Sequence, residues 1–93
     1  MTRDPERQPV RDAINRAFGD ELRFRRRNAG LTIVETMTAL DWKRGTYLRS
    51  EGGRRDLTPT EIFQIAALFE IEPEEFVDAA MRRVTIETVG GRG

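Results

Sequence analysis

Apolar residues in the first third of the chain recur at intervals of three or four positions. The recurring positions are Val10, Ile14, Ala17 or Phe18, and Leu22. This spacing places side chains on one face of an α-helix. It predicts a helix from Pro9 to about Asn28, because proline is accepted in a first turn, where its missing N–H is not needed. Gly30 follows as the expected left-handed cap.

A second, shorter helix is predicted directly after this cap. Thr32 and Glu35 are three positions apart, which is the capping-box pattern at the start of a helix. Apolar residues then follow at intervals of three, at Val34, Met37 and Leu40. Asp41 suits the turn that ends this helix, because Asp tolerates left-handed backbone angles better than most residues.

The segment at 43–51 is short and basic, and Gly52 and Gly53 stop it. As a helix, it directs Tyr47 and Leu48 to one side. Its other side carries Lys43, Arg44, Thr46 and Arg49. Isolated helices need roughly a dozen or more residues to be even marginally stable. This third helix must therefore be supported by its neighbours.

Two further helices are predicted in the second half of the chain. Thr58 and Glu61 form a second capping box, with Pro59 at the first helical position. The apolar residues that follow cover a wide arc, so this helix belongs in the core. They are Ile62, Phe63, Ile65, Ala66, Leu68 and Phe69. A fifth helix begins at Pro73 and ends near Arg83.

The two ends of the chain differ from this helical domain at 9–83. Residues 1–8 are polar and aperiodic, and we expect a flexible arm. Residues 84–89 alternate with the period of a β-strand, but a lone strand is not stable. The segment at 84–93 is therefore either a disordered tail or a strand that pairs with another copy in a twofold dimer. The pairing residues would be Val84, Ile86 and Thr88.

The composition of the 93 residues disfavours an enzyme. The chain contains no Cys and no His, so thiolate metal sites are excluded and the commonest general base is missing. We expect no catalytic site, no metal and no cofactor. No apolar run is long enough to span a membrane, and no apolar signal core is present at the N-terminus. The expected location is the cytoplasm.

Charge is unevenly distributed although the net charge is zero. Residues 1–55 carry 13 Arg and Lys against 8 Asp and Glu, whereas residues 56–93 carry 3 against 8. This asymmetry indicates a first part that faces a polyanion and a second part that faces something else. An ordinary solvated surface is the alternative.

The order of these elements resembles the lambda-repressor-like (Xre/Cro) helix-turn-helix family over roughly residues 18–77. The matching features are Arg26, the Gly30-Leu31-Thr32 segment, the signature at 47–53 that ends Glu51-Gly52-Gly53, and the segment at 65–76. The resemblance implies an all-α, five-helix domain that binds double-stranded DNA. The alternating pattern at 84–89, rather than the resemblance, adds a C-terminal strand used in dimerisation as the alternative to a disordered tail.

The resemblance also implies roles for single residues. Arg26 and Glu51 match an ion pair between the first and third helices. The base-reading positions are Lys43, Arg44, Thr46 and Arg49, which reach base edges in the major groove in such proteins. The expected phosphate-binding residues are Thr32, Arg23, Arg25, Arg27, Arg54 and Arg55.

Several residues depart from the family pattern. Thr36 and Ser50 replace apolar residues, Met37 replaces a small one, and Asp41 replaces the usual turn glycine. Ile33 stands where a DNA-contacting Gln is common. Because of these departures, the family pattern does not determine how the second helix packs against the third. The expected fold is still the five-helix domain.

Two functions fit this reading. The first is a sequence-specific transcription regulator, a dimeric repressor that reads the major groove with the helix at 43–51. The second is an antitoxin-type protein that represses its own operon and binds a protein partner through its acidic half at 56–78 and the terminal strand. The alternative for those acids is that they only solvate the last two helices.

Overall fold

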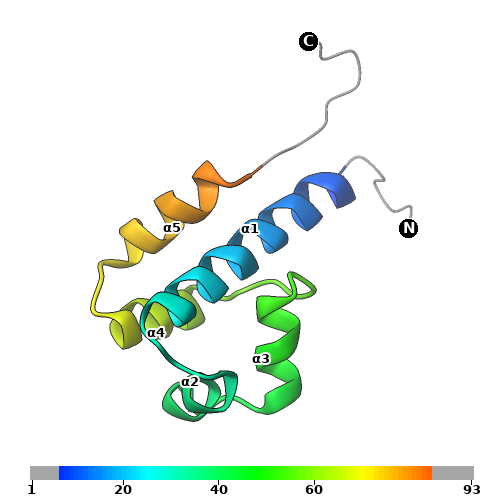
Figure 1. Cartoon of the computed structure of the whole chain (residues 1–93). Helices are drawn as coiled ribbons and strands as arrows, with labels where there is room; N and C mark the ends of the chain where they lie inside the picture. Colours follow the sequence, from blue (N-terminus) through cyan, green and yellow to red (C-terminus); the bar gives the residue numbers. More distant parts are fainter. Residues whose placement is uncertain (1–6, 85–93) are drawn as a thin grey trace.

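The computed structural model describes residues 7–84, which are entirely helical apart from short connections. Figure 1 shows the five helices: α1 (Arg7–Asn28), α2 (Ile33–Leu40), α3 (Arg44–Glu51), α4 (Pro59–Phe69) and α5 (Pro73–Arg82). The predicted all-α, five-helix class is confirmed. Among the described residues, no helix has the length and apolar character needed to cross a membrane.

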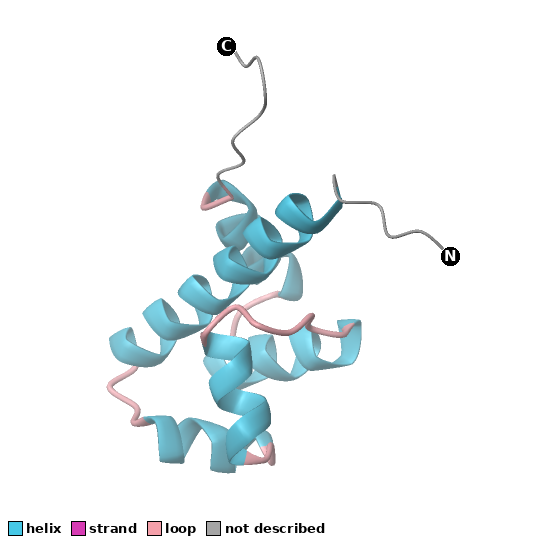
Figure 2. Ribbon diagram, turned by 90° about the vertical axis from the view of Figure 1, so that its right-hand side faces the viewer, coloured by secondary structure: helices cyan, strands magenta, loops and turns pink. Residues whose placement is uncertain are grey.

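The long helix α1 organises the arrangement. It packs against α5 on one side and α3 on another (Figure 1). Helix α4 contacts both α5 and α2, and α2 in turn contacts α3. Figure 2 turns the α3 side of the molecule towards the viewer. The short helix α3 is thus supported by both α1 and α2, as its length requires.

Each helix contributes one large side chain to the centre of the core. These residues are Leu22, Leu40, Tyr47, Ile65 and Phe76, each at most 5% exposed. Phe18 of α1 packs on Phe76, with ring centroids 5.6 Å apart. Burial of these apolar groups is the main favourable term in folding. Because every helix contributes one of these residues, detaching any helix from the domain would expose the core to water.

Two predicted helix starts are confirmed in detail. The hydroxyl of Thr32 accepts the Glu35 N–H at 3.0 Å, and the Glu35 carboxylate accepts the Thr32 N–H at 2.8 Å. Thr58 and Glu61 make the same reciprocal pair. The predicted left-handed turn residue Asp41 has φ 60°. Local sequence therefore determines where α2 and α4 begin.

The observed helix boundaries correct several predictions. Helix α1 begins at Arg7 rather than Pro9, which places the proline third in the helix, still among the N–H groups that lack a helical partner. Lys43 has extended angles, so it caps α3 and Arg44 is the first helical residue. Arg83 is the C-cap of α5. Glu70 adopts a left-handed φ of 58°, which was not predicted.

The predicted C-terminal strand lies almost entirely outside the described residues. Val84 is half-buried, and its N–H bonds to the Met81 carbonyl at 3.1 Å. Ile86 and Thr88 lie beyond the described part of the chain. The pairing of this segment with a second copy therefore stays a prediction.

The two polar departures from the family pattern are accommodated inside the protein. Thr36 is fully buried, and its hydroxyl donates to the Thr32 carbonyl at 2.9 Å. Ser50 is 2% exposed and donates to the Thr46 carbonyl at 2.8 Å. A buried hydroxyl is costly only when it lacks a hydrogen-bond partner. Both helices thus keep close packing despite the polar residues.

Helices α1 and α3 approach each other most closely at Gly19. An added Cβ at this position would lie 2.5 Å from the Glu51 carbonyl oxygen and 2.8 Å from that of Ser50. Both neighbours are backbone atoms, which cannot rotate away as a side chain could. The contact therefore requires glycine, although glycine is unfavourable inside a helix.

Gly19→Ala is expected to lower the free energy of unfolding by about 1–3 kcal/mol, as overpacking of a close contact does. Gly45→Ala is the matched control, because its methyl group would meet only the guanidinium end of Arg49 at 3.2 Å. The control should be neutral or slightly stabilising, since Ala has the higher helix propensity. Urea denaturation measures both. Equal stabilities would contradict the close contact.

Candidate nucleic-acid interface

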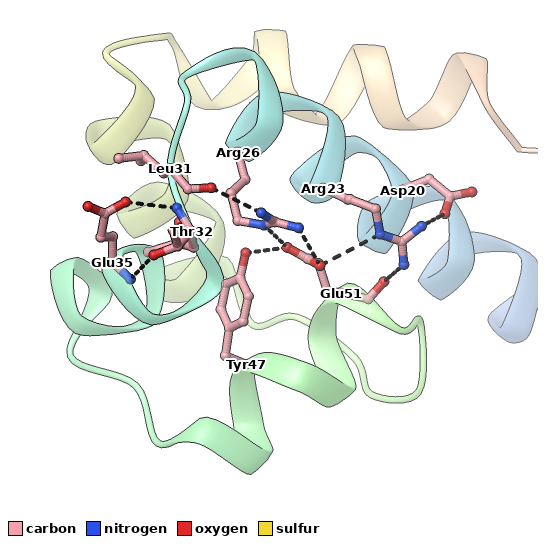
Figure 3. Close-up of polar contacts among 9 residues, drawn as sticks. Asp20, Arg23, Arg26, Leu31, Thr32, Glu35, Tyr47 and Glu51 are labelled. Atoms are coloured by element: carbon pink, nitrogen blue, oxygen red, sulfur yellow. Dashed lines mark hydrogen bonds and ion pairs between the residues drawn. The ribbon is translucent and has the colours of Figure 1, made fainter.

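The C-terminal end of α3 is anchored by a buried carboxylate. Glu51, 6% exposed, accepts from Arg26 of α1 through Nε–Oε2 at 2.6 Å and Nη2–Oε1 at 3.3 Å. The hydroxyl of Tyr47 donates to the same carboxylate at 2.5 Å. Figure 3 shows these three side chains converging between α1 and α3. The pair implied by the family resemblance is thus present, with a tyrosine as third member.

Two arginines extend this network to neighbouring backbone. Arg26 donates from Nη1 to the Leu31 carbonyl at 3.0 Å, which fixes the connection before α2. Arg23 donates to the Glu51 carbonyl at 3.1 Å and lies between that residue and Asp20 (Figure 3). Helices α1 and α3 and the loop before α2 are therefore tied by one group of charges.

These contacts shift the pKa values of Glu51 and Tyr47. Burial alone would raise the pKa of Glu51, but hydrogen bonds from Arg26 and Tyr47 outweigh it and lower this pKa below its usual value. Burial and the neighbouring carboxylate raise the pKa of Tyr47. Glu51 is therefore ionised and Tyr47 protonated near neutral pH, which is the state in which the network's donors and acceptors match.

The N-terminal end of α3 carries two of the predicted base-reading residues, Lys43 and Arg44, whereas Arg49 lies in the last turn, two residues before Glu51. Lys43, Arg44 and Arg49 are exposed and form no ion pair within residues 7–84. Thr46 is half-buried beside them. The N-cap residue Lys43 makes no side-chain hydrogen bond to the helix. Three long cations on one short helix are thus available to an external partner.

Three arginines predicted to bind phosphate have partners inside the protein instead. Arg23 belongs to the Glu51 network described above. Arg25 pairs with the buried Glu21 at 2.8 Å, on the side of α1 that faces α5. Arg55 donates to Ser50 and to Glu61 at 2.9 Å each, and its guanidinium lies 6.0 Å from the Trp42 ring. In this structure all three connect helices or loops.

The remaining predicted phosphate-binding residues are placed differently. Arg27 and Arg54 are exposed and have no ion pair within the described residues. Thr32 is exposed at the start of α2, where its hydroxyl caps the helix. Arg54 lies three residues after the end of α3, and its N–H bonds to the Arg49 carbonyl at 2.8 Å. The structure therefore places Arg54 next to Arg49, at the C-terminal end of α3.

One further arginine was missed by the sequence reasoning. Arg16 is exposed on α1, where only its solvent-facing position in the helical pattern could have singled it out. A Cβ added to Gly53 would lie 2.8 Å from the Arg16 Cα, so this part of α1 touches the loop after α3. Across the described residues, no group of three or more acidic side chains is suited to a metal ion.

Comparison with known families agrees with this geometry. A family model described as a helix-turn-helix domain matches residues 17–79, which cover α2, α3 and most of the other helices. The protein belongs to this helix-turn-helix family. The assignment is consistent with the Xre/Cro resemblance of the sequence and indicates a DNA-binding protein. A search of curated proteins found no match to the chain.

Helix-turn-helix proteins place the second helix of the motif in the major groove, with its N-terminal residues against base edges. In this chain that helix is α3, and its N-terminal end is the one that carries Lys43 and Arg44. The Glu51 network fixes the other end. The anchored end of α3 and the end that carries Lys43 and Arg44 are thus about two turns of helix apart.

Glu51→Gln is expected to lower the free energy of unfolding by about 3–5 kcal/mol at neutral pH, because Arg26 stays buried without its charge partner. Since the pKa of Glu51 is lowered on folding, its contribution is complete above its ordinary pKa of 4.5 and is lost as the pH falls through the lower folded value. The difference between wild type and variant should therefore shrink below that pH.

Urea denaturation of both proteins between neutral and acidic pH measures this difference. Glu74→Gln is the control, because Glu74 is exposed and forms no ion pair in the described part of the chain. The control should stay within about 0.5 kcal/mol of wild type. A stability difference for Glu51→Gln that does not change with pH would exclude an ionised buried carboxylate.

Proposed function

We propose that this protein is a sequence-specific transcription regulator, a dimeric repressor that reads the major groove with α3. The observation that carries the proposal is the exposed surface of α3, where Lys43, Arg44 and Arg49 have no ion-pair partner within residues 7–84. Arg pairs bidentately with guanine, and Lys reaches the same acceptors. Thr46 adds a hydroxyl that can bond to either kind of base edge.

The small number of reading side chains supports a dimer. A good bidentate contact contributes about 1–3 kcal/mol of discrimination. Specific sites are commonly about 4–10 kcal/mol better than non-specific DNA. One copy of α3 supplies three long cations, so two copies reach this range more readily. A twofold dimer would bind half-sites about one helical turn apart. A repressor then acts by occupying the operator.

Selection of bound fragments from a random duplex library at near-physiological salt tests this function. The proposal expects an enriched inverted repeat with half-sites about one turn apart. Binding that is weak, salt-sensitive and without enrichment would show that the protein does not read sequence. A single enriched half-site without its repeat would support base reading and exclude the dimer.

Arg44→Ala is expected to weaken binding to the selected site by about 1–3 kcal/mol and to relax the preference at one base pair of each half-site. Arg82→Ala is the matched control, because Arg82 is an exposed arginine on α5, outside α3. Fluorescence anisotropy with the site and its single-base variants measures both effects. An equal loss on every variant duplex would remove Arg44 from the base-reading group.

A second candidate function rests on an apolar groove between α4 and α5. The groove has a volume of about 520 Å³, and its apolar wall includes Ile62, Phe63 and Val77. Phe63 is 64% exposed, which is unusual for so large an apolar side chain. Its rim carries Glu72, Glu74 and Asp78. An antitoxin-type protein would use such a groove to bind a basic, amphipathic segment of a protein partner.

Phe63→Ser is expected to abolish a complex formed on co-expression with the product of a toxin-like neighbouring reading frame, because it removes the main apolar contact of the groove. Phe24→Ser is the control and should leave the complex intact, because Phe24 is also exposed, at 48%, but lies on α1. Size-exclusion chromatography with light scattering measures this. If Phe63→Ser instead converts a dimer of the chain alone to monomers, the groove is the dimer surface and the second candidate fails.

A further inference from the structure

A polar cleft separates the N-terminal half of α1 from the loop between α3 and α4. It has a volume of about 490 Å³, and its lining includes Arg11, Arg16, Gly53 and Arg54. The family match begins at residue 17, so the first ten residues of α1 precede it. Residues 7–16 are called the added part of α1 below, because they precede the matched residues, and they form one wall of the cleft.

One end of the cleft is closed by a set of hydrogen bonds to Asp56. Arg11 donates to both oxygens of its carboxylate, from Nε to Oδ1 at 3.0 Å and from Nη2 to Oδ2 at 2.9 Å. Asn15 donates to Oδ1 at 2.8 Å. These bonds lower the pKa of Asp56, and the positive charge of Arg11 offsets the negative charge of the carboxylate. They also hold the added part of α1 against the loop that follows α3.

The other part of the cleft presents two arginines that have no ion-pair partner in the described part of the chain. Gly53 has φ 72°, and its Cα lies so close to α1 that a Cβ would be 2.8 Å from the Arg16 Cα. Arg16 and Arg54 are exposed, line the cleft and form no ion pair within residues 7–84. Asp12 is the remaining exposed acid of the cleft, so the local charge stays positive.

We infer that Arg16 and Arg54 together bind a backbone phosphate of the DNA that α3 reads, which gives the added part of α1 a place in the interface. Arginine guanidinium groups match phosphate oxygens in geometry and charge. Arg54 lies three residues after Glu51, which places the cleft beside the C-terminal end of α3. Phosphate contacts set the register of a protein on the duplex without reading its sequence. This inference rests on the proposed function.

The variants Arg16→Ala and Arg54→Ala test it in the full chain, with Arg82→Ala as control. Each cleft variant should weaken binding to every duplex by a similar factor, and the slope of log K against log salt should become less steep by up to about 0.9 for the lost phosphate. The base preference should stay as in wild type. The control should change neither quantity. Thermal unfolding checks that all variants stay folded.

A double-mutant cycle locates the phosphate. Neutral methylphosphonates are placed one at a time along the duplex, and binding is measured for wild type and for the Arg16→Ala, Arg54→Ala double variant. One substitution should weaken wild type and leave the double variant unaffected. If every position weakens both proteins equally, the two arginines hold no phosphate and the inference is wrong.

Inorganic phosphate distinguishes DNA from a small phosphate-bearing ligand. If it shifts the NMR resonances of Arg16 and Arg54 while both variants keep the wild-type salt slope on DNA, the cleft is a site for a free anion and the DNA contact is wrong. The proposed function fails separately, by the absence of an enriched sequence. In that case the slope of log K against log salt for non-specific duplex still tests whether Arg16 contacts a phosphate.

Discussion

The structure depends on one buried carboxylate. Glu51 receives hydrogen bonds from Arg26 and Tyr47, and its own carbonyl accepts from Arg23. A buried charge is tolerated only when it is paired and its remaining lone pairs are satisfied. Here both conditions are met by residues of α1 and α3 alone. The same contacts also set the orientation of α3, so the stability of the core and the presentation of the helix that we propose reads DNA have a common origin.

Much of the fold could be predicted from local sequence. The two capping boxes, the left-handed Asp41 and the glycine stops act over three or four residues, so a single sequence contains all the information they need. The order of the five predicted helices and the motifs at 30–32 and 47–53 then indicated the family. The prediction of a pair between Arg26 and Glu51 came from that resemblance, because no local rule links positions 25 residues apart.

The individual roles of the arginines could not be predicted in this way. Arg25 and Arg55 were expected to bind phosphate. The partner of Arg25, Glu21, lies four residues earlier on the same helix, and the sequence contains this spacing but not the burial of Glu21 that makes the pair internal. The partner of Arg55, Glu61, depends on the path of the loop between α3 and α4. Ser50 shows the same limit. As a departure from an apolar position it cast doubt on the packing, yet its hydroxyl is satisfied by a carbonyl one turn earlier and by Arg55. Exposure and pairing are properties of the assembled domain, which the sequence pattern does not contain.

The uncapped start of α3 has a consequence for how the protein meets DNA. Lys43 supplies no side-chain acceptor for the first N–H groups of the helix, whereas the last turn is fixed by Glu51. Tyr47 in the first turn is fully buried in the core, so the backbone of α3 is held at its start as well as at its end. The first N–H groups of the helix have no side-chain cap, so a phosphate or base acceptor can bond to them directly. The start of α3 therefore offers a DNA duplex backbone donors on a fixed frame in addition to its cations.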